Sequence, residues 1–361
     1  MAPPPPGSRV LITGVTGYIG FHILLDALRA GWTVLGTSRS QARLDNLASN
    51  PAVLAAVSTP SSLELIQAPD SDDEAEQRAF FTAALRGITH VVHTAAPLPL
   101  PHANPTAGVL RPTIAGARAL LAALAAAQPP PSRLVVTSSF LATLSPYPPD
   151  PTIRVTPETR APAPSEHALA DVGEDPITAY RLGKGVVLRL LDEYAAESST
   201  DVVIVFPGFV HGGHEGARTM AEFDVSTMFL MRSLVTGVRA PMGRVGGAIH
   251  IKDTAAVHVA ALDEERVPRA GDGKPTSLGA TIPVVYDDTW GIVQKHFPEA
   301  VAAGVFTQGS EETWASGWDS TQTEKLLGMK FRSYEEMVVD FAKKYIELLP
   351  KSSAGHEDVL S

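Results

Sequence analysis

A tyrosine and a lysine four residues apart are the residues of this chain best suited to move a proton. Tyr180 and Lys184 lie near the start of a predicted helix, so their spacing puts both side chains on one face. A phenol has a pKa of about 10, and an ammonium about 4 Å away can lower it by roughly three units. We expect Tyr180 to act as a general acid toward a carbonyl oxygen, with Lys184 lowering its pKa and binding a ribose. The spacing alone is weak evidence, because an exposed tyrosine and lysine can also show it.

A serine hydroxyl can complete this catalytic set. Ser139 follows an apolar strand predicted at 134–137, within the run Thr-Ser-Ser-Phe. A hydroxyl at such a strand end can hydrogen-bond a substrate oxygen on which negative charge develops. The same run is also ordinary turn or capping chemistry, so Ser139 needs support from the other residues.

Three glycines near the N-terminus predict a turn that binds a dinucleotide. Gly14, Gly17 and Gly20 separate an apolar strand at 9–12 from a helix predicted at 21–30. Glycine there lets the chain turn sharply, lets the backbone approach a pyrophosphate, and lets the helix pack closely on the sheet. The N–H groups at the helix start then favour an anion.

The residues after the second strand, predicted at 33–37, indicate which dinucleotide binds. Arg39 and Arg43 follow this strand, and no acidic residue stands at its end. A ribose 2′-phosphate needs positive charge there, whereas NAD commonly meets an aspartate or glutamate. We therefore expect NADP(H), although Asp45 can instead pair with either arginine. Asp70, after the third strand, is expected to contact the adenine or to cap a helix.

Composition narrows the class of protein. The chain has 361 residues, 44% of them hydrophobic, no cysteine and a net charge of -10. The negative charge argues against nucleic acid or a membrane as a partner, and the lack of cysteine excludes disulfides and thiolate chemistry. We expect a cytoplasmic enzyme, monomeric or homodimeric, without a metal site or a signal peptide, and with flexible tails at 1–6 and 350–361.

Strands and helices alternate over the first two hundred residues, which predicts a doubly wound parallel α/β sheet of the Rossmann type. Further strands are expected at 63–66, 90–94, 134–137 and 202–206, with long helices at 114–127 and 178–196. Residues 7–206 and 237–262 are expected to form the NADP-binding domain, including a return to the sheet near 249–251. Residues 207–236 and 263–349 are expected to form a smaller substrate-binding lobe, and the proline-rich stretch 145–175 a long loop bordering the site.

Taken together, these motifs resemble the extended short-chain dehydrogenases/reductases. The resemblance is strongest to the branch of dihydroflavonol reductases, cinnamoyl-CoA reductases and yeast-type aldehyde (methylglyoxal) reductases. It is carried by residues 13–20, 39, 93–97, 111–116, 137–139, 180, 184, 207–212 and 250–255. It implies that Ser139, Tyr180 and Lys184 form a catalytic triad and that Arg39 and Arg43 bind the 2′-phosphate. The family usually has serine before the lysine, where this chain has Gly183.

The motifs and the resemblance together define the expected contacts. Cofactor contacts are expected from Thr13, Gly14, Gly17, Tyr18, Ile19, Gly20, Arg39, Arg43, Asp70, Thr94, Ala95, Ala96, Thr137, Tyr180, Lys184, Pro207 and Val210. Substrate contacts are expected from Phe140, Leu141, Phe209, His211 and Phe223, with Met220, Met228 and Phe229 as further wall residues. This mostly apolar wall favours an aldehyde or ketone with a hydrophobic or aromatic body as the substrate.

We therefore expect an NADPH-dependent reductase, of the carbonyl reductase or alcohol dehydrogenase type. Two alternatives remain open. A sugar-nucleotide epimerase or dehydratase would use the same tyrosine and lysine but retain NAD, and a sensor would bind NADP without catalysis.

Overall fold

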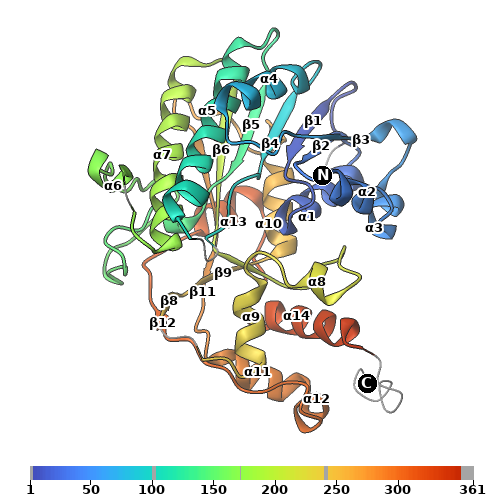
Figure 1. The fold of residues 1–361 in the computed structure, drawn as a ribbon, viewed down its shortest axis with the longest axis vertical. Coiled ribbons are helices and arrows are strands. Elements are labelled where there is room, and N and C mark those ends of the chain that lie inside the picture. The colour runs from blue at the N-terminus through green and yellow to red at the C-terminus, as the bar shows by residue number, and fades with distance from the viewer. Residues whose placement is uncertain (1–2, 100–102, 171, 240–242, 351–361) are drawn as a thin grey trace.

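A parallel sheet of seven strands forms the centre of the larger part of the molecule (Figure 1). The structure is a computed structural model that describes residues 3–99, 103–170, 172–239 and 243–350. The strands are β1 (Arg9–Thr13), β2 (Thr33–Ser38), β3 (Leu63–Gln67), β4 (His90–His93), β5 (Arg133–Thr137), β6 (Asp201–Pro207) and β10 (Thr276–Ala280). Their spatial order is β10, β6, β5, β4, β1, β2, β3, and every neighbouring pair is parallel. The predicted doubly wound sheet is confirmed.

Apolar runs explain where the inner strands form. Leu11 and Ile12 of β1, Val91 of β4, and Val203 and Ile204 of β6 are fully buried. Strands covered on both faces bury successive residues, so they read as continuous apolar stretches rather than as an alternating pattern. This is why these inner strands could be placed from the sequence.

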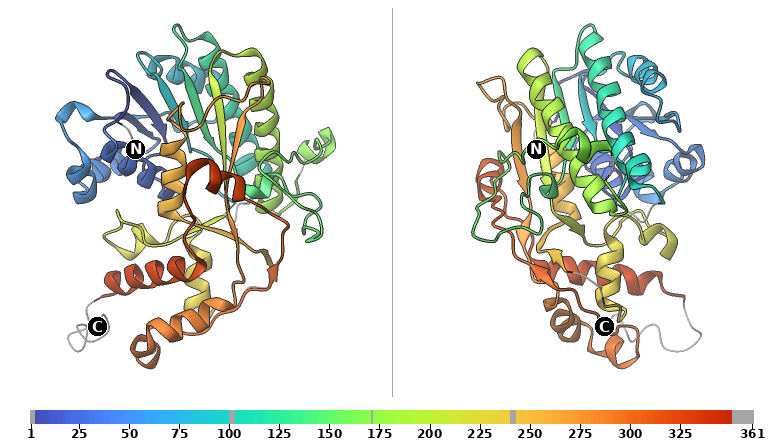
Figure 2. Two further views of the ribbon diagram at one scale, coloured as in Figure 1. Left: turned by 180° about the vertical axis from the view of Figure 1, so that it is seen from behind. Right: turned by 60° about the vertical axis from the view of Figure 1, so that its left-hand side comes forward.

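Helices cover both faces of the sheet (Figure 2). On one face, α5 (Arg111–Ala126) packs between α4 (Glu74–Ala84) and α7 (Pro176–Glu197). On the other, α1 (Tyr18–Arg29) packs against α10 (Ile251–Ala260). The shorter helices of this part are α2 (Gln41–Ala48), α3 (Pro51–Ala56), α6 (Glu166–Ala170) and α13 (Thr321–Leu327). The long loop expected at 145–175 thus contains one short helix, α6, and its residue 171 lies outside the described residues.

Capping residues set where the two helices nearest the site begin. Helix α1 starts at Tyr18, three residues before the predicted start, because Gly17 is its N-cap and Gly20 is already helical. Helix α7 starts at Pro176, and the Asp175 carboxylate accepts hydrogen bonds from backbone N–H groups of its first turn. Proline at the first helical position and aspartate at the N-cap are both favourable.

One helix in the described part of the chain is long and apolar enough to cross a membrane by length and composition. It runs over Thr106–Ala126, a π-helical turn (Thr106–Leu110) continued by α5, with a mean hydropathy of 1.4. Its most apolar window is 56% buried inside the protein, and α5 packs against α4 and α7. A core helix passes the same test, so this finding does not support a membrane span.

The smaller part of the molecule lies below the sheet in Figure 1. Its strands form a three-stranded sheet in the order β11, β9, β7 and a separate parallel pair. These strands are β7 (Phe209–His211), β8 (Arg244–Val245), β9 (Gly247–His250), β11 (Ile282–Pro283) and β12 (Thr313–Trp314). Its helices are α8 (Met220–Phe223), α9 (Met228–Val235), α11 (Asp288–His296), α12 (Pro298–Ala302) and α14 (Tyr334–Leu348). Of the predicted tails, residues 1–2 and 351–361 lie outside the described residues.

The structure corrects two expectations about how the chain returns to the main sheet. The segment near 249–251 does not join it, because its strand β9 pairs with β7 and β11. The strand beside β6 is instead β10, inside the range 263–349 expected for the lobe. Residues Thr276 to Ala280 include only one large apolar side chain, Leu278, so this edge strand gives a weak signal in the sequence. The division into two functional domains stays a prediction.

A buried ion pair ties the far end of the main sheet together. The Arg133 side chain on β5 is fully buried and pairs with Asp201 on β6. Its guanidinium also donates to the carbonyl oxygens of Ala261 at 2.8 Å and Val267 at 2.7 Å. The pair therefore connects both strands to the chain that follows α10.

Replacing Asp201 by alanine should leave a buried guanidinium without its counter-charge. We expect Asp201→Ala to lower the free energy of unfolding by about 3–5 kcal/mol, measured by urea denaturation. The exposed ion pair Lys274–Asp272 provides the control, and Asp272→Ala should change stability by less than about 1 kcal/mol. Equal effects of the two substitutions would contradict this account.

Candidate active site

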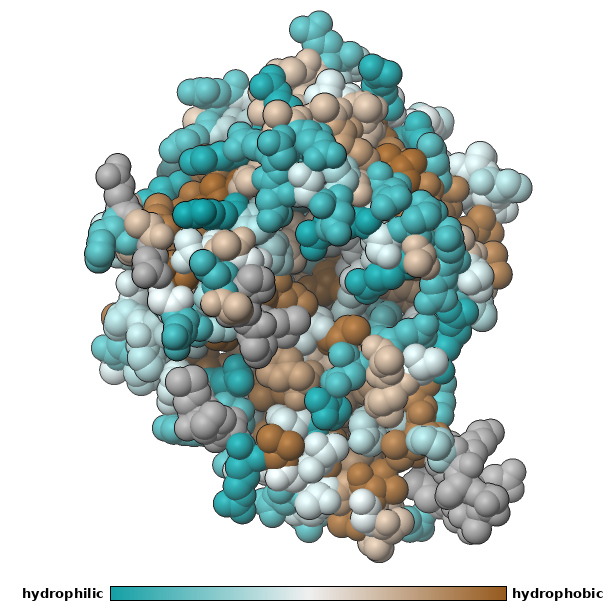
Figure 3. Space-filling model, in the orientation of Figure 1, coloured by the Kyte–Doolittle hydropathy of each residue, from teal (hydrophilic) through white to brown (hydrophobic). Residues whose placement is uncertain are grey.

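A cavity of about 770 Å³ opens at the carboxyl edge of the parallel sheet. Its wall combines the turn after β1, the ends of β2, β3 and β4, and the segment 224–229 from the smaller part. Figure 3 shows the surface hollowed between the two parts, with apolar side chains in the hollow. This size and position are typical of ligand sites in open α/β sheets.

Most of the predicted cofactor residues line this cavity. Those on its wall are Thr13, Gly14, Gly17, Tyr18, Ile19, Gly20, Arg39, Arg43, Asp70, Thr94, Ala95 and Ala96. Thr137, Tyr180, Lys184, Pro207 and Val210 lie outside its lining. Whether each residue contacts a cofactor stays a prediction.

The glycine turn has the shape that a pyrophosphate requires. Gly14 has a φ of +74°, in the left-handed region that favours glycine. A Cβ on Gly20 would lie 2.2 Å from the Gly14 carbonyl oxygen, so the start of α1 packs too closely for any side chain. No side chain caps the N-terminus of α1, which leaves its N–H groups for an anion. The turn therefore fits a dinucleotide.

Two arginines flank the cavity where a ribose 2′-phosphate is expected. Arg43 donates from Nη2 to the carbonyl oxygen of Thr16 at 2.6 Å, which holds it beside the glycine turn. Arg39 lies 3.4 Å from Asp70, and both of these side chains are exposed. Asp45 accepts a hydrogen bond from Gln41 at 2.7 Å, and no ion pair joins it to either arginine within the described ranges. Arg43 therefore has no acidic partner among the described residues, whereas a phosphate would have to compete with the exposed Asp70 for Arg39.

The structure brings the three candidate catalytic residues together. Ser139 at the end of β5 lies close enough to Tyr180 on α7 for its hydroxyl to lower the pKa of the tyrosine. The Lys184 ammonium lies 5.8 Å from the centroid of the Tyr180 ring. It donates to the carbonyl oxygen of Thr137 at 2.9 Å, which fixes it against the same strand end. Lys184 and Ser139 are buried.

The electrostatics of this group differ from the expectation. Burial raises the pKa of Tyr180 to about 12, and the nearby Ser139 hydroxyl offsets only part of that rise in pKa. Burial also lowers the pKa of Lys184 to about 8. The predicted lowering of the tyrosine pKa by the lysine is absent, because desolvation dominates and the ammonium is directed at Thr137. Tyr180 consequently keeps its proton at neutral pH, as a proton donor must.

Gly183 stands where the family usually has serine, and the helix has room for a side chain there. A Cβ at this position would lie 3.4 Å from the Thr113 side chain and 3.5 Å from Leu110. These are ordinary van der Waals contacts, and neither neighbour belongs to the candidate triad. The departure therefore leaves the proton-transfer groups in place.

The predicted substrate residues occupy the packed core beside the site. Phe140, Leu141, Phe209, His211 and Phe223 are all buried, and none lines the cavity. Sequence pattern cannot separate a core aromatic residue from a pocket wall, because both are apolar. Substrate contact by these five residues stays a prediction.

The smaller part contributes other residues to the cavity wall. They are Asp224, Val225, Ser226 and Phe229. Only Phe229 was considered from the sequence. Ser226 has a φ of 54°, which is uncommon for a residue with a side chain and shows that this segment bends sharply at the wall.

The sequence reasoning also missed wall residues on the larger part. Phe80, Phe81 and His93 line the cavity, and His93 immediately precedes the predicted contacts 94–96. The end of a parallel strand beside the glycine turn was the signal that could have identified His93.

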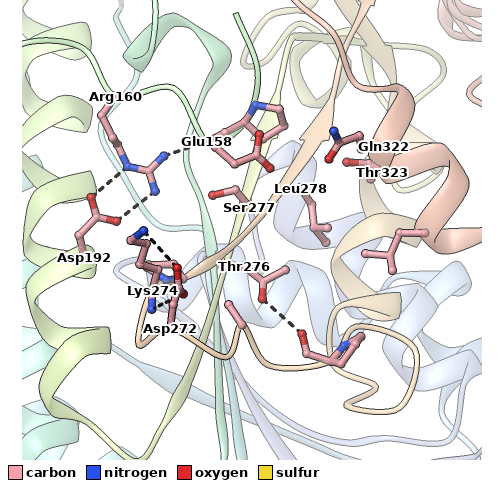
Figure 4. Close-up of a pocket in the computed structure, with 15 residues that line it drawn as sticks. Glu158, Arg160, Asp192, Asp272, Lys274, Thr276, Ser277, Leu278, Gln322 and Thr323 are labelled. Atoms are coloured by element: carbon pink, nitrogen blue, oxygen red, sulfur yellow. Dashed lines mark hydrogen bonds and ion pairs between the residues drawn. The ribbon is translucent and has the colours of Figure 1, made fainter.

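A second cavity, of about 750 Å³, lies beside the edge strand β10 (Figure 4). Its main charged groups are already paired. Arg160 makes two hydrogen bonds of 3.0 Å with Asp192, and Lys274 lies 3.1 Å from Asp272. No glycine is among the described residues of its wall, so this cavity lacks the glycine turn that fits the larger cavity to a dinucleotide.

Comparison with known families agrees with this geometry. Residues 10–272 match the model of the NAD dependent epimerase/dehydratase family, a range that includes the glycine turn and the triad. The chain belongs to this family. The predicted resemblance to the extended short-chain dehydrogenases/reductases is thereby confirmed.

Several proteins similar to this chain are named as reductases. The ketoreductase CTB6 of Cercospora nicotianae is 30% identical, over 97% of this chain and 98% of its own length. The NAD-dependent epimerase/dehydratase ALT6 of Alternaria alternata is 29% identical, over 91% and 95% respectively. The yeast methylglyoxal/isovaleraldehyde reductase Gre2, solved with NADPH, shares the fold with a TM-score of 0.77 at 22% identity, over 94% of this chain and 98% of its own. The likeness to the ketoreductase supports an oxidoreductase, and the likeness to Gre2 shows the fold.

Alanine substitutions at two glycines should show which position has room for a side chain and which does not. We expect Gly183→Ala to raise the free energy of unfolding by about 0.5–1 kcal/mol, because alanine is the better helix former and the space is open. Gly20→Ala should instead destabilise the protein and weaken dinucleotide binding, since its Cβ would overlap Gly14. Thermal unfolding and NADPH titration measure both effects. A Gly20→Ala protein that binds like wild type would contradict the proposed close packing.

Proposed function

We propose that this protein is an NADPH-dependent reductase of aldehydes or ketones that carry a hydrophobic or aromatic body. The observation that carries the proposal is that the Ser139 hydroxyl lies close enough to Tyr180 to lower its pKa, while the Thr137 carbonyl holds Lys184 against the same strand end. Two neighbouring hydroxyls can both turn toward one carbonyl oxygen. Relatives named as ketoreductases support the same reaction class.

The residues around the larger cavity suit NADPH. The glycine turn and the start of α1 would hold the pyrophosphate, and Arg39 and Arg43 the 2′-phosphate. Lys184 would hydrogen-bond the ribose next to the nicotinamide. A bound nicotinamide cofactor supplies the hydride for reduction.

The protein's own residues then donate the proton and stabilise the negative charge. Ser139 and Tyr180 hold the substrate oxygen, and Tyr180 donates its phenolic proton to that oxygen as negative charge develops on it. The reaction leaves a phenolate, and stabilising it requires the Lys184 ammonium to turn from the Thr137 carbonyl oxygen toward the tyrosine oxygen. A lysine whose pKa is about 8 is still mostly protonated at pH 7 and can supply this charge.

Apolar residues on the cavity wall favour a hydrophobic substrate. Val225 and Phe229 project from the smaller part, and Pro97 and Leu98 follow β4. Such a wall removes apolar surface from water, at about 25 cal/mol per Å², but offers little to a charged sugar nucleotide.

The role of Tyr180 can be tested by removing one oxygen. We expect Tyr180→Phe to lower kcat for an aryl ketone about 100-fold or more, with the Kd for NADPH changed less than twofold. Tyr194→Phe is the matched control on the same helix, because the Tyr194 hydroxyl is buried without a hydrogen-bond partner within the described residues. Turnover that survives Tyr180→Phe would exclude this residue as the acid.

Cofactor preference can be tested at the two arginines. We expect the double substitution Arg39→Ala and Arg43→Ala to raise the Kd for NADPH about 10- to 100-fold and to leave that for NADH nearly unchanged. Arg9→Ala, at the amino end of β1, is the control. Purified protein that carries tightly bound NAD, or activity confined to NADH, would favour the epimerase alternative instead.

A further inference from the structure

His93 ends strand β4 at a point between the two halves of the candidate site. Along the carboxyl edge of the sheet the neighbouring strands are β5, β4, β1, β2 and β3. The glycine turn follows β1, Arg39 follows β2, and Asp70 follows β3, while Ser139 follows β5 on the other side. His93 therefore separates the glycine turn from the candidate catalytic residues, and its side chain lines the cavity.

Hydrogen-bond accounting fixes which nitrogen of His93 carries the proton. The Thr13 hydroxyl oxygen accepts backbone N–H groups from Thr94 at 3.1 Å and from Ala95 at 3.2 Å. These two bonds use both lone pairs of the hydroxyl oxygen, so the hydroxyl must donate its proton in a hydrogen bond to its third neighbour. That neighbour is the His93 Nδ1 atom, at 2.9 Å. Thr13 thus donates to Nδ1, and the proton of the neutral ring lies on Nε2.

The Nε2–H group is left free to serve a ligand. It has no hydrogen-bond partner among residues 3–99, 103–170, 172–239 and 243–350. Burial and the positive charge of Lys184 lower the pKa of His93 to about 3, so the ring stays neutral across the physiological range. A neutral donor at this place suits an uncharged or anionic oxygen without adding a second cation beside Lys184.

We propose that His93 donates a hydrogen bond from Nε2 to an oxygen of the bound dinucleotide on its nicotinamide side. The assignment to that side follows from the strand order, because Arg39 and Asp70 lie beyond the glycine turn from His93. The inference rests on the proposed function for the identity of the ligand. His93 is then a cofactor-positioning residue whose donor is set by Thr13, the residue directly before the glycine turn.

Ligands with and without the nicotinamide half can test this role. We would measure the Kd values of NADPH and of adenosine 2′,5′-bisphosphate, which lacks the nicotinamide riboside, for wild type, His93→Leu and His93→Gln. His93→Leu should raise the Kd of NADPH about 3- to 10-fold and that of the fragment less than twofold. His93→Gln keeps an N–H donor and should restore most of the NADPH affinity. His90→Leu, on the same strand at its amino end, is the matched control and should change neither Kd.

Nitrogen-15 NMR of the imidazole groups gives a readout independent of cofactor and folding effects. The imidazole signals that are present in the wild-type protein and missing in His93→Gln belong to His93. These signals should show a protonated Nε2 and an unprotonated Nδ1. A protonated Nδ1 would overturn the proposal.

The binding data separate the possible failures. An unchanged NADPH affinity in His93→Leu, in a wild type that binds NADPH and reduces carbonyls, would overturn this inference alone. Equal weakening of NADPH and the fragment would show a merely structural role and would also overturn it. A wild type that does not bind NADPH would overturn both this inference and the proposed function.

Discussion

The close approach of α1 to the end of β1 is the constraint on which the site depends. Gly20 packs against the Gly14 carbonyl, and Gly14 in turn lies against Thr94 at the end of β4. The Thr94 hydroxyl donates to the Thr13 carbonyl oxygen at 2.7 Å, so backbone and side chains join the two strand ends. This packing fixes the direction of the first helix and the spacing of the strands that carry the cavity wall. A single methyl group at Gly20 would disturb both the direction of the helix and the spacing of the strands.

Burial shapes the chemistry of the site more than direct charge pairing does. Desolvation raises the pKa of Tyr180 and lowers those of Lys184 and His93. Each shift favours the neutral form of the group, since a charge in a low-dielectric interior is costly. The protein thereby keeps the Tyr180 phenol on α7 protonated and the His93 imidazole at the end of β4 neutral. Only Lys184, with its pKa near neutrality, offers a charge to the developing oxyanion.

The sequence predicted those features that depend on residues near one another in the chain. The glycine spacing predicted the turn, continuous apolar runs predicted β1 to β6, and the tyrosine and lysine spacing predicted residues that the fold brings to Ser139. Features that depend on distant partners were missed. Strand β10 has a weak apolar signal and is defined by its position beside β6, and Phe140 and Phe223 look like pocket residues until their core packing is known. The role of His93 becomes visible only through the hydrogen bonds that Thr13 makes across two strands.

The late position of β10 in the chain also constrains how the protein folds during synthesis. Strand β6 is complete at Pro207, but the strand that covers its outer edge ends at Ala280, after β7, β8 and β9 have been made. Until then a hydrophobic inner strand has an open edge, which is the kind of surface that pairs with other chains. The main sheet therefore includes a strand that is made after β7, β8 and β9 of the smaller part. The sheet that holds the cofactor site reaches its final width only when much of the smaller part has left the ribosome.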